Sequence, residues 1–160
     1  MIEIISTESI PKLALHYLNS PADTLCYTDQ NDFKRWIFEL YEKIEIKIDF
    51  VKGQPYSSMN DLAKDYHKKN IRVSTDFNNC PYLGQEINLF HRAVHDCHHV
   101  QKNAKFDWYG EQVVCAYTSS LTNRDIFYRI LRSDLVYLLA AQIYLGRFPE
   151  GPQKLILSDP

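Results

Sequence analysis

The amino-acid sequence predicts a mainly α-helical fold: a compact multi-helix domain with a small two-stranded β element. Apolar residues recur at helical spacing over most of the 160 residues. Alternation of apolar and polar residues, the pattern of a strand with one buried face, is confined to residues 44–50 and 71–76. No internal repeat or low-complexity linker divides the chain. We therefore expect a single domain over residues 1–160.

Two helices precede the strands. The first is expected from about Ile10 to Leu18, with Pro11 near its start, where a missing N–H costs little. The second follows the cap candidates Asp29 and Asn31. Its apolar and aromatic residues recur on one side and predict a face packed in the core: Phe33, Trp36, Ile37, Leu40, Tyr41 and Ile44.

The two predicted strands have a helix between them. In IEIKIDF, residues 44–50, apolar residues alternate with charged ones, and a similar alternation follows in residues 71–76. The intervening segment, from about Ser58 to Lys69, has the pattern of a helix. The two strands could therefore pair across this helix.

A helix from about Gln85 to Asn103 carries four of the six histidines. The nine-residue loop KNAKFDWYG follows and ends at Gly110, and a new helix is expected to open near Glu111. This geometry lets the second helix turn back and place its first-turn carboxylate near the histidines.

The last predicted helix is long and buried. Thr122 or Asn123 can cap its start, and it reaches Leu145 before Gly146 ends it. Its second half is apolar nearly all round, which indicates a central position. The tail FPEGPQKLILSDP is expected to be extended along the surface.

Composition excludes several classes of protein. The net charge of −2 and the lack of a long Lys/Arg block argue against nucleic acid as a partner. The most apolar window, residues 135–145, is about half of the roughly 20 residues that cross a bilayer, so we expect no transmembrane segment. The N-terminus lacks the basic start of a signal peptide. We expect a cytoplasmic protein, with peripheral membrane association, homo-oligomerisation or membership of a protein complex left open.

The four cysteines support a reducing compartment. They contain no CxxC pair and are widely spaced, which predicts free thiols rather than a disulfide scaffold: Cys26, Cys80, Cys97 and Cys115.

The histidines in FHRAVHDCHH, residues 90–99, fall on one side of a helical wheel. Exposed helix faces usually carry Lys, Glu, Gln or Arg, which have a higher helix propensity than histidine. A transition metal is the commonest reason to gather neutral imidazoles. The sequence therefore predicts a metal site on this helix.

His95 and His99 are the first predicted ligands, because side chains at i and i+4 reach a common point. Asp96 could complete the coordination sphere, orient an imidazole, or act as the base for metal-bound water. Glu111 is the expected carboxylate from the next helix. Such a donor set favours zinc, with iron or manganese as alternatives.

The other candidate side chains are assigned lesser roles. His91 and His98 are interpreted as outer-shell or substrate-facing groups, or as ordinary surface histidines. Cys115 lies one turn after Glu111, but a lone helical cysteine is more often a small core residue. For His16 and His67 we expect a structural role.

The metal-site segment also resembles a known motif. It contains His95, Asp96, two residues, His99, eleven residues and Glu111. This spacing resembles the HDxxH-x11-E signature of the ubiquinone (coenzyme Q) biosynthesis family, which consists of helical metal-binding proteins of the quinone-synthesis complex. The resemblance implies that these four residues are ligands. It also implies a role in organising quinone-synthesis enzymes and in processing the carboxyl-bearing carbon of the polyprenylated ring. FHRAVHD followed by YGE is also similar to a pattern in uncharacterised bacterial and phage proteins, which implies a shared metal-site scaffold.

Three functions remain as hypotheses. The first is a metal-dependent enzyme acting on a small or lipophilic organic substrate, in which Asp96 is the catalytic residue. The second is a non-catalytic scaffold or binding module with a structural metal. The third is an HD-type phosphohydrolase that uses His67, the His95–Asp96 pair and a later aspartate, Asp125 or Asp134.

Overall fold

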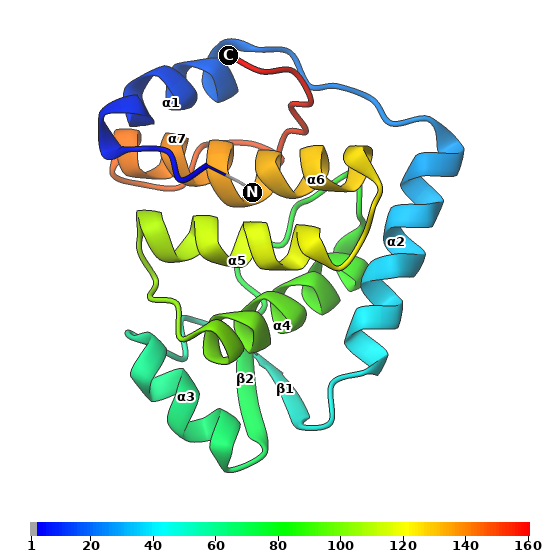
Figure 1. Ribbon diagram of the computed structural model, residues 1–160, viewed down its shortest axis with the longest axis vertical. Helices are drawn as coiled ribbons and strands as arrows, with labels where there is room; N and C mark the ends of the chain where they lie inside the picture. The colour runs from blue at the N-terminus through cyan, green and yellow to red at the C-terminus, as the bar shows by residue number, and fades with distance from the viewer. Residues whose placement is uncertain (1–2) are drawn as a thin grey trace.

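The structure is a computed structural model and describes residues 3–160. It confirms the predicted fold class, because it is mainly helical with one small sheet (Figure 1). Its elements are η1 (Thr7–Ser9), α1 (Ile10–Asn19), α2 (Tyr27–Glu42), β1 (Lys47–Val51), α3 (Met59–His67), β2 (Asn70–Ser74), α4 (Gln85–Lys102), α5 (Trp108–Ser120), α6 (Asp125–Arg132), η2 (Ser133–Tyr137) and α7 (Leu138–Leu145).

The sheet is a pair of parallel strands joined through α3. β1 and β2 pair in the register Ile48 to Ile71 and Phe50 to Val73. Ile71 and Val73 are fully buried and pack with Leu62 of α3 in a small core of their own. The predicted pairing across a helix is thus confirmed, although β1 begins at Lys47 rather than at residue 44.

The elements are stacked in layers around α4. In Figure 1, α1, α6 and α7 lie above α5, and α4 lies below α5, next to the strands and α3. α4 contacts α2, α3, α5 and β2. The helix that carries the histidine segment is therefore covered on several sides and does not present a histidine face to solvent.

The C-terminal tail is extended, as expected, but it does more than cover the surface. Leu155 and Ile156 are fully buried and belong to the main core. The backbone N–H of Ile156 donates to the Ser133 hydroxyl over 2.8 Å, and that of Lys154 donates to the Tyr17 hydroxyl over 2.9 Å. Leu155 and Ile156 thus complete the core between α1 and the last helices.

Two predicted helix caps are wrong, and a third helix begins three residues earlier than expected but keeps Glu111 in its first turn. α2 begins two residues before Asp29, because the Cys26 side chain takes the cap position and accepts the Asp29 N–H. α6 follows Arg124 rather than Thr122 or Asn123, and the Thr122 hydroxyl accepts the Arg124 N–H instead. α5 starts at Trp108, three residues before Glu111, since Asp107 caps it. In α2 and α5 the side chain just before the helix accepts one of the free N–H groups of the first turn, whereas α6 has no side-chain cap.

The long last helix is interrupted in its middle. Residues Ser133–Tyr137 form a π-helical turn between α6 and α7. Such wide turns inside α-helices are frequent at functional sites. Asp134 of this turn contacts His91 of α4, and both Asp134 and Leu135 line a cavity.

The four cysteines are free, as predicted. Within residues 3–160, each helix is too short or too polar to reach from one side of a bilayer to the other.

Candidate metal centre

Two imidazoles of α4 and one carboxylate of α5 converge at the contact between these helices. Glu111 Oε2 lies 2.9 Å from His95 Nε2, and Glu111 Oε1 lies 3.1 Å from His99 Nε2. The two Nε2 atoms are 3.0 Å apart. The geometry that the i, i+4 spacing predicted for the two histidines is therefore present, and Glu111 reaches both of them.

The end of α4 orients the His99 ring. Asn103 adopts the left-handed conformation that ends the helix, and the following Ala104 N–H donates to the His99 carbonyl over 2.9 Å. The Ala104 carbonyl in turn lies 2.9 Å from His99 Nδ1. Because a carbonyl only accepts, Nδ1 carries the hydrogen, and a neutral ring then directs the lone pair of Nε2 at the cluster.

The start of α5 sets the position of Glu111. The Asp107 carboxylate accepts the Gly110 N–H over 2.8 Å and caps the helix. At Gly110 the loop passes so close that an added Cβ would lie 1.8 Å from the Lys105 carbonyl oxygen. Only glycine fits here. The close approach lets the loop turn back at once, and the next residue, Glu111, lies in the first turn of α5 against α4. A carboxylate there is also favoured by the helix dipole.

Charge pairing governs protonation in this cluster. Burial alone would lower the pKa of His95, but the charge and hydrogen bond of Glu111, with Asp96 and Asp134 nearby, raise it to about 9. Burial would raise the pKa of Glu111, but His95 and His99 lower it to about 2. The carboxylate is therefore ionised at neutral pH, as a metal ligand must be.

Asp96 lies beside the cluster but is not a member of it. The group of residues whose ligand atoms lie within 4.8 Å of one another comprises His95, His99 and Glu111. Asp96 lines the adjoining cavity. Burial raises the pKa of its carboxyl to about 6, against the opposing effect of His95 and His99. Its predicted role as a fourth ligand stays a prediction, and its position also suits the alternative role of a base.

A cavity of about 420 Å³ opens next to the cluster. Its polar lining includes His95, Asp96 and Glu111, with Arg92, Asn88 and Asp134. Its apolar lining comes from several elements: Phe77, Phe106, Leu135, Leu138, Leu139 and Phe148. One of these rings, Phe106, packs edge-on against His99 of the cluster. The volume is within the range of sites that hold a small organic molecule.

His91 and His98 are buried and contact residues that the sequence did not single out for them. His91 Nδ1 lies 3.3 Å from Asp134 Oδ2, and His98 Nδ1 lies 2.7 Å from the Thr118 hydroxyl. Burial lowers the pKa of both imidazoles, that of His98 to about 4. Both are interior groups, so the interpretation of either as a surface histidine is wrong.

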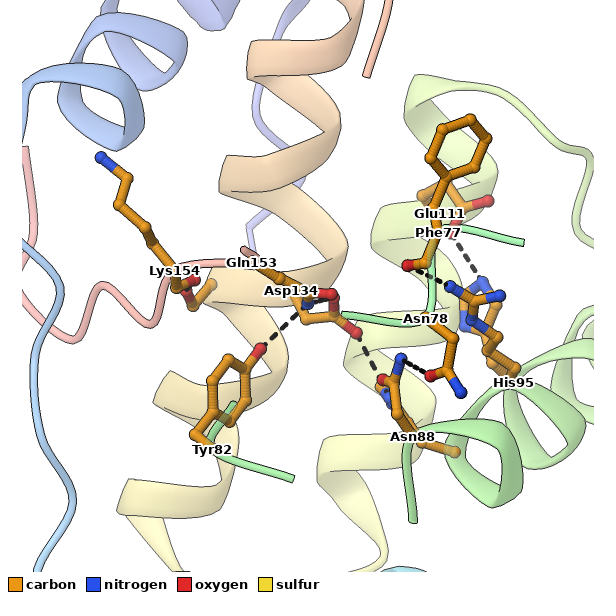
Figure 2. A network of polar contacts seen from close by, with 12 residues as sticks. Phe77, Asn78, Tyr82, Asn88, His95, Glu111, Asp134, Gln153 and Lys154 are labelled. Carbon is orange, nitrogen blue, oxygen red and sulfur yellow. Dashed lines mark hydrogen bonds and ion pairs between the residues drawn. The ribbon is translucent and has the colours of Figure 1, made fainter. Parts of the chain in front are cut away.

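Asp134 belongs to a polar network that sequence reasoning missed as a partner of His91. Gln153, from the C-terminal tail, donates through its Nε2 to Asp134 and to the Tyr82 hydroxyl. Figure 2 shows this group beside the His95–Glu111 contact. The spacing in the sequence offers no signal for it, because its members are spread from residue 82 to residue 153 and meet only through the π-helical turn.

The remaining candidates lie apart from the cluster. Cys115 is buried in the main core, and burial raises its pKa to about 12, which disfavours the thiolate that a metal requires. His16 contacts the Ser158 carbonyl near the chain end, and His67 is exposed at the end of α3. The structural role expected for His16 fits these contacts.

The two Nε2 atoms, and each of them with the Glu111 carboxylate oxygen nearest to it, are spaced as ligands of a divalent ion. Ligands 2.0–2.1 Å from a tetrahedral zinc lie roughly 3.3 Å from one another, close to the observed separations of 2.9–3.1 Å. Two imidazoles and one carboxylate suit zinc, and the same set with open positions suits iron.

Comparisons of the chain with models of known protein families, with curated proteins and with solved structures found no match.

Proposed function

We propose that the protein binds one divalent metal ion, zinc in the first instance, through His95, His99 and Glu111. One observation carries this proposal. The two Nε2 atoms and the Glu111 carboxylate come within 2.9–3.1 Å of one another in a partly buried site. Each imidazole is delivered by its own turn of α4, and the carboxylate by the capped first turn of α5.

The proposal extends to a metal-dependent enzyme that acts on a small or lipophilic organic molecule. The cavity of about 420 Å³ beside the cluster supports this, because a purely structural ion needs no space next to it. A bound zinc ion would supply Lewis acidity. Asp96 lies on the same cavity wall, where its carboxylate can take a proton from a reacting group.

Membership in the ubiquinone-biosynthesis family stays part of the proposal. Its support is the spacing of His95, Asp96, His99 and Glu111 within residues 95–111. The reaction on the quinone ring would follow from that membership alone.

A non-catalytic scaffold is the second candidate. The observation in its favour is that the cluster joins α4 to α5, so that an ion there would link two helices of the core. An HD-type phosphohydrolase is less favoured, because His67 is exposed and Asp125 pairs with Arg129 at the surface.

Metal titration tests the first step. We expect metal-free protein to bind about one equivalent of Zn²⁺ in isothermal titration calorimetry, and the double variant His95→Ala/His99→Ala to bind none. The matched control is His16→Ala/His67→Ala, which removes two histidines outside the cluster and should bind as the natural chain does. Equal binding by the natural chain and the cluster variant would contradict the proposal.

Cobalt substitution separates the enzyme from the scaffold. An open coordination position lets azide bind Co²⁺, which changes the visible absorption bands, whereas a closed structural site leaves them unchanged. We expect the bands to shift on addition of azide. Unchanged bands in fully loaded protein would favour the scaffold.

A further inference from the structure

The apolar wall of the cavity is built for a flat or aliphatic body. Phe77 and Phe148 stack with ring centroids 4.9 Å apart and an angle of 5° between their planes. Phe77 adopts a positive φ of 51°, which is uncommon for a bulky residue. Both rings line the cavity, and three leucines of the last helices extend the same surface: Leu135, Leu138 and Leu139.

Arg92 holds the Phe77 segment in place and has little capacity left for an anion. Its Nη1 donates to the carbonyl oxygens of Ser74 and Asp76, over 2.9 and 2.5 Å, and its Nη2 donates to that of Phe77 over 2.9 Å. Three guanidinium N–H groups of Arg92 are therefore committed to backbone carbonyls.

Carboxylates dominate the polar lining. In metal-free protein four acidic residues line the cavity against two cationic groups, Arg92 and the protonated His95: Asp76, Asp96, Glu111 and Asp134. An ion bound to the cluster adds two positive charges but displaces any proton on His95, so the carboxylates still outnumber the cationic charge. The field inside the cavity opposes an anion and favours a cation.

Asp96 is the carboxylate that is free to bind a ligand. Glu111 contacts the two cluster histidines, Asp134 contacts His91 and Gln153, and Asp76 accepts the Gly53 N–H over 3.1 Å. No residue in the range 3–160 donates a hydrogen bond to Asp96, although its side chain lines the cavity. The Asp96 side chain is half-buried and its carboxylate is open to the cavity, so a ligand that donates N–H groups can replace water there with charge-assisted hydrogen bonds.

We infer that the cavity binds a small amphipathic amine: a molecule with a protonated amino group at Asp96 and an aromatic or aliphatic body against Phe77, Phe148 and the three leucines. The role of this amine as the substrate rests on the proposed function, whereas its binding to the cavity does not require the metal. The amino end lies beside His95 and Glu111, so the bonds next to the nitrogen are the part of the molecule nearest to the ion.

Three probes that share a phenylethyl-type body test the inference. Phenethylamine, 2-phenylethanol and phenylacetate differ mainly in the charge of the polar end. Each is titrated at neutral pH into metal-free and into zinc-loaded ¹⁵N-labelled protein, and binding is followed by amide chemical shifts in residues 74–77 and 134–139. We expect phenethylamine to bind roughly tenfold or more tightly than phenylacetate in both forms.

Asp96→Asn supplies the decisive variant, since it keeps the size of the side chain and removes its charge. We expect it to abolish the preference for phenethylamine and to leave the binding of 2-phenylethanol unchanged. Asp61→Asn, on an exposed position of α3, should behave as the natural chain does.

The outcomes separate the two proposals. Equal binding of the amine and the acid, tighter binding of the acid, no binding of any probe, or an amine preference that survives Asp96→Asn would each overturn the inference. A zinc titration of the same samples tests the metal proposal independently: protein that binds zinc but shows no amine preference refutes the inference alone. Protein that prefers the amine but binds no zinc refutes the metal site alone.

Discussion

Two histidines three residues apart on α4 have opposite protonation behaviour. His95 faces the Glu111 carboxylate over 2.9 Å, and its pKa is raised to about 9. His98 faces the Thr118 hydroxyl over 2.7 Å, and burial lowers its pKa to about 4. Burial acts in the same direction on both imidazoles, so the difference comes from the partner on the facing helix. A buried histidine becomes a candidate ligand or an interior packing group according to what α5 presents to it.

Glu111→Gln should have the largest effect, because it removes the charged partner that distinguishes His95 from His98. The amide keeps the shape of the side chain but is a poor zinc ligand, so we expect Zn²⁺ affinity to fall more than about 100-fold, since losing an outer-shell partner alone costs roughly 10- to 100-fold. Competition with a zinc indicator measures the change. Glu39→Gln, on an exposed position of α2, is the control. An unchanged affinity would remove Glu111 from the site.

The second test uses acid and metal-free protein. The His98 imidazole takes up a proton below pH 6.5 when unfolded but only near pH 4 when folded. Acid therefore favours the unfolded chain, and His98 should cost about 3 kcal/mol of stability as the pH falls from 6.5 to 4. Urea denaturation across this range measures it.

The contribution of His98 to this loss of stability is measured by comparing the natural chain with His98→Asn. Its stability should fall less steeply over the same pH range, whatever its absolute value. His67→Asn, which changes an exposed histidine, should keep the slope of the natural chain. Identical slopes for His98→Asn and the natural chain would show that His98 is not held neutral.

Gly110→Ala tests how α5 places its carboxylate. The added Cβ would meet the Lys105 carbonyl at 1.8 Å, so the loop and the first turn of α5 must separate. We expect a loss of about 1–3 kcal/mol in stability by urea denaturation, together with weaker zinc binding as Glu111 moves. Ser120→Ala, at the exposed end of α5, is the control. Unchanged zinc affinity in folded Gly110→Ala would show that Glu111 does not depend on this close approach.

The smallest expected effect is at the partner of His98. Thr118→Val removes the hydroxyl and leaves a buried imidazole nitrogen unpaired, which should cost about 1 kcal/mol in the free energy of unfolding. Thr118→Ser keeps the hydroxyl and should recover most of this loss. Zinc affinity should stay the same in both variants, because Thr118 contacts His98 and not the cluster. A large loss of zinc affinity in Thr118→Val would join His98 to the site.

Local sequence patterns predicted most of the elements and the two histidines of the cluster. Helical spacing located α1, α3 and α4, and alternation located the strands, because these signals depend on neighbours along the chain. The i, i+4 spacing of His95 and His99 placed both side chains on one side of α4 before any packing was known. The short loop ending in Gly110 pointed to Glu111 for the same reason.

Contacts between distant segments were beyond such reasoning. Asp134, in the π-helical turn, contacts His91 of α4, and Gln153 joins it from the extended tail. The tail itself was expected on the surface, yet Leu155 and Ile156 lie in the core. The predicted cap of α2 was also wrong, because the Cys26 side chain accepts the N–H of Asp29, which the sequence had suggested as the cap.

The order of residues along the chain is enough to give α4 four imidazoles and to put an acidic residue after a loop short enough to bring it back to them. Packing against the other helices selects which of those imidazoles contact the carboxylate and which contact a hydroxyl or Asp134. It also determines that Asp96 faces a cavity. The physical reason is that helical spacing fixes direction within one element, whereas the charge or hydrogen-bond partner that sets the chemistry of a buried side chain arrives from another element through packing.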